Sequence, residues 1–136
     1  MSLLLDTNVV SEVRKRRPDA GVTAWFASTR SSDLRLSVMV IGELRIGIER
    51  LARRDKEQAA LHEEWLADLL DLFEDRIVPV TVDIAEAWGR LAVPDPVPIV
   101  DGLLAATALV HDWTLVTRNV TDVRRTGVRL LNPFGD

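Results

Sequence analysis

The chain has 136 residues, 47% hydrophobic and 28% charged, a balance that excludes a disordered protein and indicates one soluble globular domain over residues 1–136. It has no cysteine, which excludes disulfides, thiolate zinc sites and cysteine nucleophiles. The formal net charge of −4 argues by itself against a nucleic-acid partner. However, 15 of the 17 basic residues are arginine, a side chain that favours bidentate phosphate contacts.

Short apolar segments alternate with segments of helical periodicity. In chain order we expect a strand at 3–5, a helix at 9–16, a helix opening at 18–19, a strand at 34–38, helices at 40–54 and 58–73, a strand at 76–80, a helix capped by Thr81 or Asp83, a proline-rich break at 93–98, a helix at 100–111, and strands at 114–117 and 128–131. Strands separated by helices predict an α/β fold with a parallel sheet covered by helices on both faces. No basic leader or bilayer-length apolar segment is visible, so we expect a cytoplasmic protein without a membrane partner.

Asp6 follows the first expected strand, in the segment LLLDTNVVSE. One interpretation is a helix cap, because Asp, Thr and Asn are common at helix N-termini. The other is a ligand-binding residue, because the carboxyl ends of parallel strands share one edge of the sheet, where open α/β sheets bind ligands. Asp6 alone does not decide between the two.

Glu43 lies in the expected helix of SVMVIGELRIGIERL, just after the second strand. Its helical neighbours three and four positions away are apolar or small, namely Met39, Val40, Ile46 and Gly47. We therefore expect Glu43 to project from the buried stripe of the helix. A buried carboxylate is costly unless it is paired with a cation or bound to a metal. An internal ion pair and a metal ligand are equally good interpretations at this point.

Two more carboxylates follow later strands. Asp101 opens a helix in PIVDGLLAATALVHD, where the simpler interpretation is a contact with the helix dipole, although Gly102 beside it indicates close backbone packing. Asp122 follows the fourth strand in a predicted loop with Asn119, where the simpler interpretation is a turn residue. All four carboxylates are nevertheless expected at one sheet edge. Oxygen ligands without cysteine or a histidine pair suit Mg²⁺ or Mn²⁺, and such a metal on carboxylates indicates phosphate chemistry.

The other chemically interesting residues favour structural roles. His62 and His111 lie far apart without a partner at metal-ligand spacing, so both are interpreted as structural. The four tryptophans are interpreted first as core residues, and no phosphate-binding glycine loop is present.

The segments LLLDTNVVSE, VIGELRIGIERL, DGLLAATAL and LVTRNVTD resemble, in order and spacing, the acidic motifs of the PIN-domain ribonucleases. GVRLLNPF is similar to the usual end of that family. The resemblance covers essentially the whole chain and is greatest to the VapC-type toxins of bacterial toxin–antitoxin systems. One departure is Val123, where many members carry an aromatic residue.

The resemblance implies a PIN-like α/β/α sandwich of about five strands and an endoribonuclease that depends on Mg²⁺ or Mn²⁺. The residues implied to be catalytic and metal-binding are Asp6, Glu43, Asp101 and Asp122. Those implied to orient ligands or water are Thr7, Asn8, Thr117 and Asn119. Candidates for RNA backbone contacts are Arg14, Arg16, Arg17 and Arg118. The implied partners are RNA, a second copy of the chain, and a cognate VapB-type antitoxin whose tail inserts an arginine among the carboxylates, in a larger toxin–antitoxin complex.

Three alternatives remain. A response-regulator receiver domain would need a phosphoacceptor aspartate at the end of the third strand, where VPVT offers none. A PIN-like protein-binding module without catalysis is disfavoured because all four acidic positions are filled. A metal-dependent DNA nuclease is separated from a ribonuclease by the resemblance alone.

Overall fold

The structure is a computed structural model that describes residues 1–135. A sheet of five parallel strands forms its centre, in the order β3-β2-β1-β4-β5. The strands are β1 (Leu3–Leu5), β2 (Leu34–Ser37), β3 (Ile77–Val78), β4 (Thr114–Val116) and β5 (Arg129–Leu131). Because β1 lies between β2 and β4, its carboxyl end is flanked by the ends of both neighbours. The predicted parallel sheet is confirmed.

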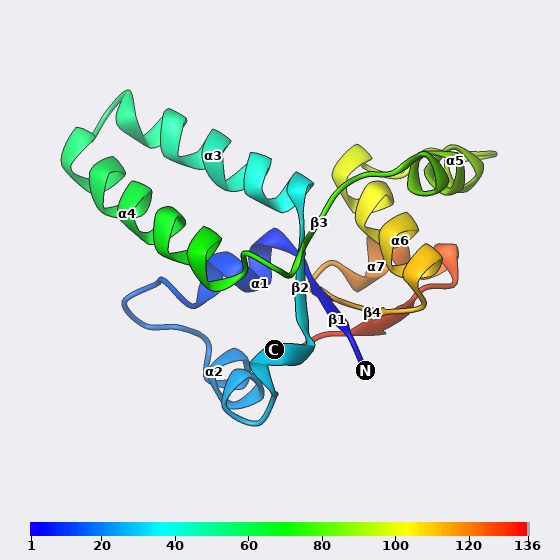
Figure 1. Ribbon diagram of the computed structural model, residues 1–136, viewed down its shortest axis with the longest axis horizontal. Helices are drawn as coiled ribbons and strands as arrows, with labels where there is room; N and C mark the ends of the chain where they lie inside the picture. Colours follow the sequence, from blue (N-terminus) through cyan, green and yellow to red (C-terminus); the bar gives the residue numbers. More distant parts are fainter. Residues whose placement is uncertain (136) are drawn as a thin grey trace.

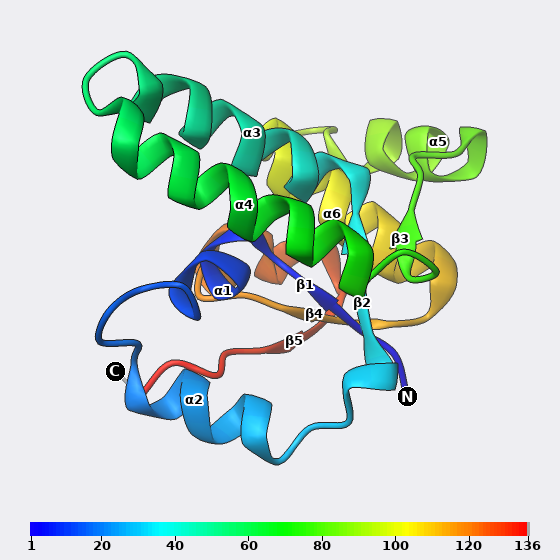
Figure 2. The same ribbon diagram turned by 60° about the vertical axis from the view of Figure 1, so that its left-hand side comes forward.

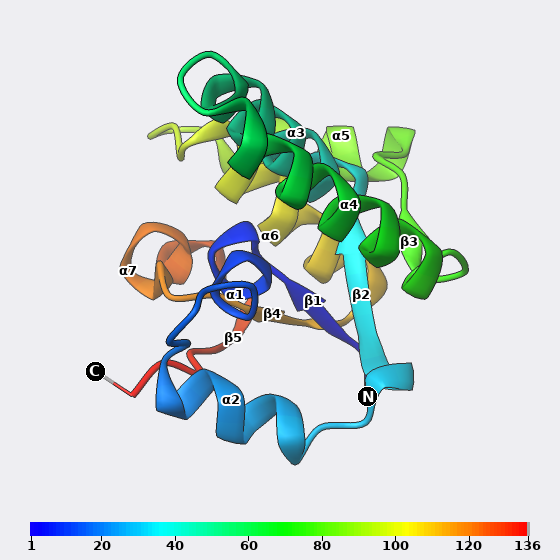
Figure 3. The same cartoon turned by 90° about the vertical axis from the view of Figure 1, so that its left-hand side faces the viewer.

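Helices cover both faces of this sheet, as Figures 2 and 3 show with α2 on one side and the α3–α4 hairpin on the other. The helices are α1 (Thr7–Glu12), α2 (Ala20–Ala27), α3 (Val38–Ala52), α4 (Lys56–Leu72), α5 (Val82–Leu91), α6 (Ile99–His111) and α7 (Val120–Val123), with 3₁₀ turns at Ser31–Asp33 and Arg124–Thr126. In Figure 1 the α3–α4 hairpin projects from the sheet at the opposite end of the molecule from α5. The predicted α/β/α sandwich is therefore confirmed.

Local hydrogen bonds explain where several elements differ from their predicted bounds. Val38 begins α3 instead of ending β2, because the Ser37 hydroxyl caps the helix by accepting from the Met39 N–H at 3.0 Å. Thr81, not Asp83, caps α5. The strand predicted at 76–80 keeps only two residues, and Pro79, which has no N–H to donate, follows it directly. The helix predicted at 9–16 begins at Thr7 and ends at Glu12.

The core surrounds the central strands and fixes their carboxyl ends. Leu4, Leu5, Leu36 and Leu115 are almost fully buried, as expected for strands covered on both faces. Among the described residues, no helix combines the length and apolar character needed to cross a bilayer.

Candidate active site

Asp6 lies at the end of β1 with its carboxylate held by three donors. One oxygen accepts from the Thr7 backbone N–H at 2.7 Å, and the other from the Thr117 hydroxyl at 2.6 Å and the Asn8 amide at 3.2 Å. The side chain caps α1, so the helix-cap interpretation is confirmed, while the ligand-binding interpretation stays a prediction. Burial raises the pKa of Asp6 although these hydrogen bonds lower it, and the charge of Glu43 raises it further.

Glu43 lies on α3 beside Asp6, at the boundary of the buried stripe and not in its middle. The buried residues of this helix are Val40, Leu44 and Ile48, whereas Ile46 is 49% exposed. The expectation that Glu43 projects from the buried stripe is therefore wrong in part, because its neighbour Ile46 is exposed. Its carboxylate instead accepts a 2.5 Å hydrogen bond from the Thr7 hydroxyl, which joins α3 to the first turn of α1.

Asp101 lies in the first turn of α6, as predicted. Burial and, after it, the charges of Asp6, Asp122 and Glu43 together raise its pKa to about 6. The neighbouring Gly102 permits this position, because a Cβ there would lie 2.6 Å from Val97 Cγ2 and 3.0 Å from the indole ring of Trp88. The close packing of α5 and α6 expected around Gly102 is thus present.

Asp122 lies in the short helix α7, and the prediction of a loop here is wrong. A four-residue helix carries too little periodicity to be seen in the sequence. Val123 is 1% exposed and anchors α7 in the core, while Asp122 is exposed. Its charge still acts on Asp101, so the structure brings together the four carboxylates that we call the acidic cluster: Asp6, Glu43, Asp101 and Asp122.

The acidic cluster fits a hard cation in its charge and donor chemistry. Every interaction that shifts the pKa of Asp101 raises it, with no cation lowering it within the described part of the chain. Carboxylate oxygens without thiolate or imidazole are the donors that Mg²⁺ and Mn²⁺ accept. Across residues 1–135, however, no three Asp, Glu or His side chains are gathered closely enough to hold an ion in the present arrangement. The acidic cluster is thus electrostatically coupled but not a closed set of ligands.

The four hydroxyl and amide residues expected around the acidic cluster are placed unequally. Thr7, Asn8 and Thr117 all donate directly to Asp6 or Glu43. Asn119 lies one step further out, where its backbone N–H donates to the Thr117 hydroxyl at 3.0 Å.

The arginines expected to contact RNA divide between two places. The Arg118 backbone N–H donates to Asn8 at 3.3 Å, and its guanidinium lies 4.5 Å from the Phe134 ring. Arg14 and Arg16 lie after α1, where they line a hollow of about 570 Å³ that we call the basic hollow: Ser11, Arg14, Lys15, Arg16, Gln58 and His62. Arg17 is exposed and does not line it. His62, which was interpreted from the sequence as structural, also lines the basic hollow, and its spacing from Gln58 places both on one face of α4.

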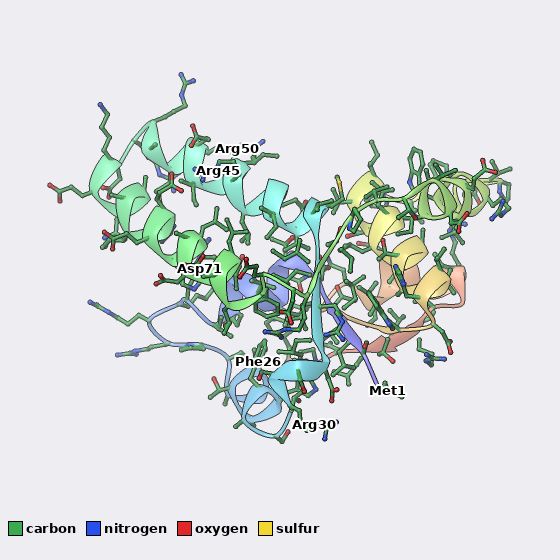
Figure 4. All side chains as sticks on the ribbon, in the orientation of Figure 1. Met1, Phe26, Arg30, Arg45, Arg50 and Asp71 are labelled. Carbon is green, nitrogen blue, oxygen red and sulfur yellow. The ribbon has the colours of Figure 1, made fainter. Side chains whose placement is uncertain are left out.

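A second hollow, of about 350 Å³, lies between α1, α2 and α4 and is almost entirely apolar. Its walls include Val13, Phe26, Trp65 and Leu72. Figure 4 shows Phe26 on α2, near the end of α4 where Asp71 is labelled. We call this the apolar groove.

Several known proteins are similar to the chain over nearly its whole length. The family model described as PIN domain matches residues 3–127. Toxin FitB of Neisseria gonorrhoeae is 33% identical over 98% of this chain and 99% of its own, and the VapC ribonuclease Y4jK of Sinorhizobium fredii is 28% identical over 97% of both. The crystal structure of FitAcB from Neisseria gonorrhoeae aligns with a TM-score of 0.85 at 33% identity, covering 96% of this chain and 97% of that one.

Proposed function

The chain belongs to the PIN-domain family, and from that premise we propose that it is an endoribonuclease toxin, acting in the cytoplasm as one PIN domain, dependent on Mg²⁺ or Mn²⁺ and neutralised by a cognate antitoxin. The observation that carries this proposal is the pKa of Asp101, raised to about 6 by burial and by three other carboxylates from different elements. Four acids that repel one another at the carboxyl edge of a parallel sheet favour a bound cation.

The residues of the acidic cluster would divide the work. Asp6 and Asp101 would hold the cation, while Glu43 and Asp122 complete the cluster or position the attacking water. When bound, the cation supplies Lewis-acid stabilisation of the phosphate and makes water a better nucleophile. Thr117, Asn8 and the Thr7 N–H orient the carboxylate of Asp6, and the Thr7 hydroxyl orients Glu43. These donors fix the acids before substrate arrives, which reduces the cost of binding.

The antitoxin would contact two features of the surface. The solved relatives include FitAB bound to an IR36 DNA fragment, at a TM-score of 0.85 and 32% identity, covering 96% of this chain and 94% of that one. By analogy, an apolar segment of the antitoxin would fill the apolar groove, and an arginine of its tail would neutralise the acidic cluster. We also propose a homodimer within the larger complex, to which exposed apolar side chains on α3, α5 and α6 offer a surface: Val38, Ile46, Val82 and Ile99.

The test is cleavage of a mixed pool of transfer, ribosomal and messenger RNA by the purified chain. Reactions would contain Mn²⁺, Mg²⁺ or EDTA, after mass spectrometry has shown that no antitoxin co-purified. Asp101→Asn is the test variant, and Asp83→Asn, an exposed acid on α5, is the matched control. We expect metal-dependent cutting by wild type and by Asp83→Asn, and none by Asp101→Asn.

Other outcomes would assign a different function. Cutting of a DNA pool but not RNA would indicate a DNA nuclease, and no cutting of either would indicate a protein-binding module. Equal RNA cutting by Asp101→Asn and wild type would mean that the acidic cluster is not the active site.

A further inference from the structure

The basic hollow has an excess of positive charge that the protein does not neutralise. Three of its six lining residues are cations, and none is acidic. Lys15 is offset by Glu12, at 2.8 Å between Nζ and Oε1. Arg14 and Arg16 form no ion pair with a carboxylate anywhere in residues 1–135. The hollow therefore carries two uncompensated guanidinium groups.

The arginines are presented by a segment that is already fixed in place. Glu12 is 6% exposed, and its second carboxylate oxygen accepts the backbone N–H of Asp19 at 2.8 Å. Asp19 in turn caps α2 by accepting from Val22 at 3.1 Å. The segment after α1 is thus tied at both ends, and little conformational freedom is lost when a ligand binds it.

Arg14 is also held in position by its own side chain. Its guanidinium lies 5.1 Å from the centre of the Trp65 ring, within the range of a cation–π contact. Burial lowers the pKa of Arg14, which shows that this cation is partly removed from water. A partly desolvated guanidinium without a carboxylate is a strong receptor for an anion, and its planar fork matches phosphate.

The opposite wall supplies neutral hydrogen-bonding groups. Gln58 and His62 are four residues apart on α4, so they share a face of that helix. Burial lowers the pKa of His62, and the charge of Arg14 lowers it further, so both favour the neutral imidazole. Asp55 fixes the start of α4 by accepting from the Gln58 N–H at 3.1 Å. The wall thus adds an amide and an imidazole to the two guanidinium groups.

The basic hollow lies close to the acidic cluster along a single helix. Asp6 caps α1 and Ser11 lies near its other end, a separation of about 8 Å along the helix axis at 1.5 Å per residue. Thr7, between them, contacts Glu43. The basic hollow is therefore near enough to the acidic cluster for neighbouring phosphates of one polyanion to reach both.

We propose that the basic hollow binds a backbone phosphate of the RNA substrate next to the position that is cut. Arg14 and Arg16 supply the charge, and Gln58 and His62 supply hydrogen bonds. The inference rests on the proposed ribonuclease function and extends it in two ways. It assigns Arg14 and Arg16, but not Arg17 or Arg118, to one phosphate subsite, and it gives His62 a role in binding. The contact is with the backbone, so it adds affinity without selecting a base.

The first test is binding of a single-stranded RNA oligonucleotide at several salt concentrations. All proteins would carry Asp101→Asn, so that the bound RNA stays intact. Arg14→Gln with Arg16→Gln is the test pair, and Arg53→Gln with Arg54→Gln, exposed at the tip of the α3–α4 hairpin, is the charge-matched control. For the test pair we expect Kd to rise on the order of tenfold and the slope of log K against log salt to fall by about 0.7, the change for one lost phosphate contact on a single strand. The control pair should change Kd less than twofold.

The second test needs no arginine variant and so does not depend on the folding of one. The chain has two histidines, so the imidazole signals in an NMR spectrum are those of His62 and His111, assigned with His62→Gln. Addition of the oligonucleotide should move the His62 signal and raise its pKa, and should leave His111 unchanged.

The outcomes separate this inference from the function on which it rests. If the wild type cuts RNA but the Arg14 and Arg16 pair binds as tightly as its control, the phosphate subsite is refuted and the ribonuclease stands. The same holds if His62 responds to the antitoxin but not to RNA, which would assign the hollow to the protein partner. If the wild type neither binds nor cuts RNA, the proposed function is wrong and this inference fails with it.

Discussion

Two residues of α3 that lie two positions apart meet opposite surroundings. Arg45, labelled on α3 in Figure 4, donates two hydrogen bonds of 2.8 and 2.6 Å to Glu63 of α4. It also donates one of 3.3 Å to Glu49. Glu43 faces α1 and the other acids of the acidic cluster, where, within residues 1–135, the Thr7 hydroxyl is the only hydrogen-bond donor to its side chain. In the hairpin, charge joins two helices. In the acidic cluster, charge is left unbalanced, and we expect a ligand from outside the chain to balance it.

The largest expected effect is the loss of a charge from the acidic cluster. Asp6→Asn keeps the size of the side chain but removes the central carboxylate, so we expect RNA cleavage to fall at least 100-fold, about 3 kcal/mol of transition-state stabilisation. The measurement is the single-turnover rate with Mn²⁺, with circular dichroism as a check of folding. A rate within fivefold of wild type would mean that the charges of the acidic cluster, like those of the α3–α4 hairpin, are not needed for cleavage.

The next effect concerns the hydroxyl that holds Asp6. Thr117→Val leaves one buried carboxylate oxygen with only Asn8 as a donor, so we expect the free energy of unfolding at pH 7 to fall by about 1.5–3 kcal/mol, the usual range for hydrogen bonds to charged groups. Urea unfolding would measure it. Thr107→Val is the matched control, because that buried hydroxyl donates to the neutral carbonyl of Leu103 at 2.7 Å and should cost about 1 kcal/mol. Equal losses in the two variants would show that the charge of Asp6 adds nothing.

A third prediction concerns pH in the metal-free protein. The folded pKa of Asp101 is raised from 3.8 to about 6, so its ionisation destabilises the folded state as pH rises through that window. Asp101→Asn should therefore be more stable than wild type at pH 7, by about 1–2 kcal/mol after allowance for solvent screening, and the two should become equal only as pH falls below the unfolded pKa of 3.8. The difference between the two proteins is the quantity to measure, because the lowered pKa of His62 acts in the opposite direction in both.

Added Mn²⁺ gives the control for that prediction. At pH 7 the ion should raise the Tm of wild type and have little effect on Asp101→Asn, because the variant has lost a ligand. If the wild type is less stable than Asp101→Asn both in the presence and in the absence of Mn²⁺, the ion does not balance the repulsion among the four carboxylates.

The smallest effect is expected in the hairpin. Arg45→Gln breaks the ion pairs with Glu63 and Glu49, but all three side chains are more than 40% exposed, so the free energy of unfolding should fall only slightly. Cleavage should be unchanged. A loss of activity in Arg45→Gln would show that the hairpin also belongs to the functional region.

The sequence predicts the sheet well because its strands are short, mostly apolar and bounded by helical periodicity. It places Asp6, Glu43 and Asp101 correctly along the chain for the same reason. It fails at α7, which is too short to show a period, and on the face of α3, where exposed Ile46 imitates a buried position. It also does not show the basic hollow, since His62 and the arginines after α1 that line the hollow with it lie about 46 positions apart along the printed sequence. Contacts of this kind depend on tertiary structure and leave no local pattern.

The hydrogen bond between Thr117 and Asp6 has a consequence for the synthesis of the protein. It joins residues 111 positions apart, and the neighbouring backbone bond from Asp6 to Val116 spans almost the same length of chain. Asp6 therefore leaves the ribosome well before the residues that hold it at the end of β4. Since β1 cannot complete its pairing until β4 has been made, a nascent chain carries Asp6 without the arrangement that would make the acids a nuclease. A toxin built in this order gains its acidic cluster late in its synthesis, after β4 has emerged.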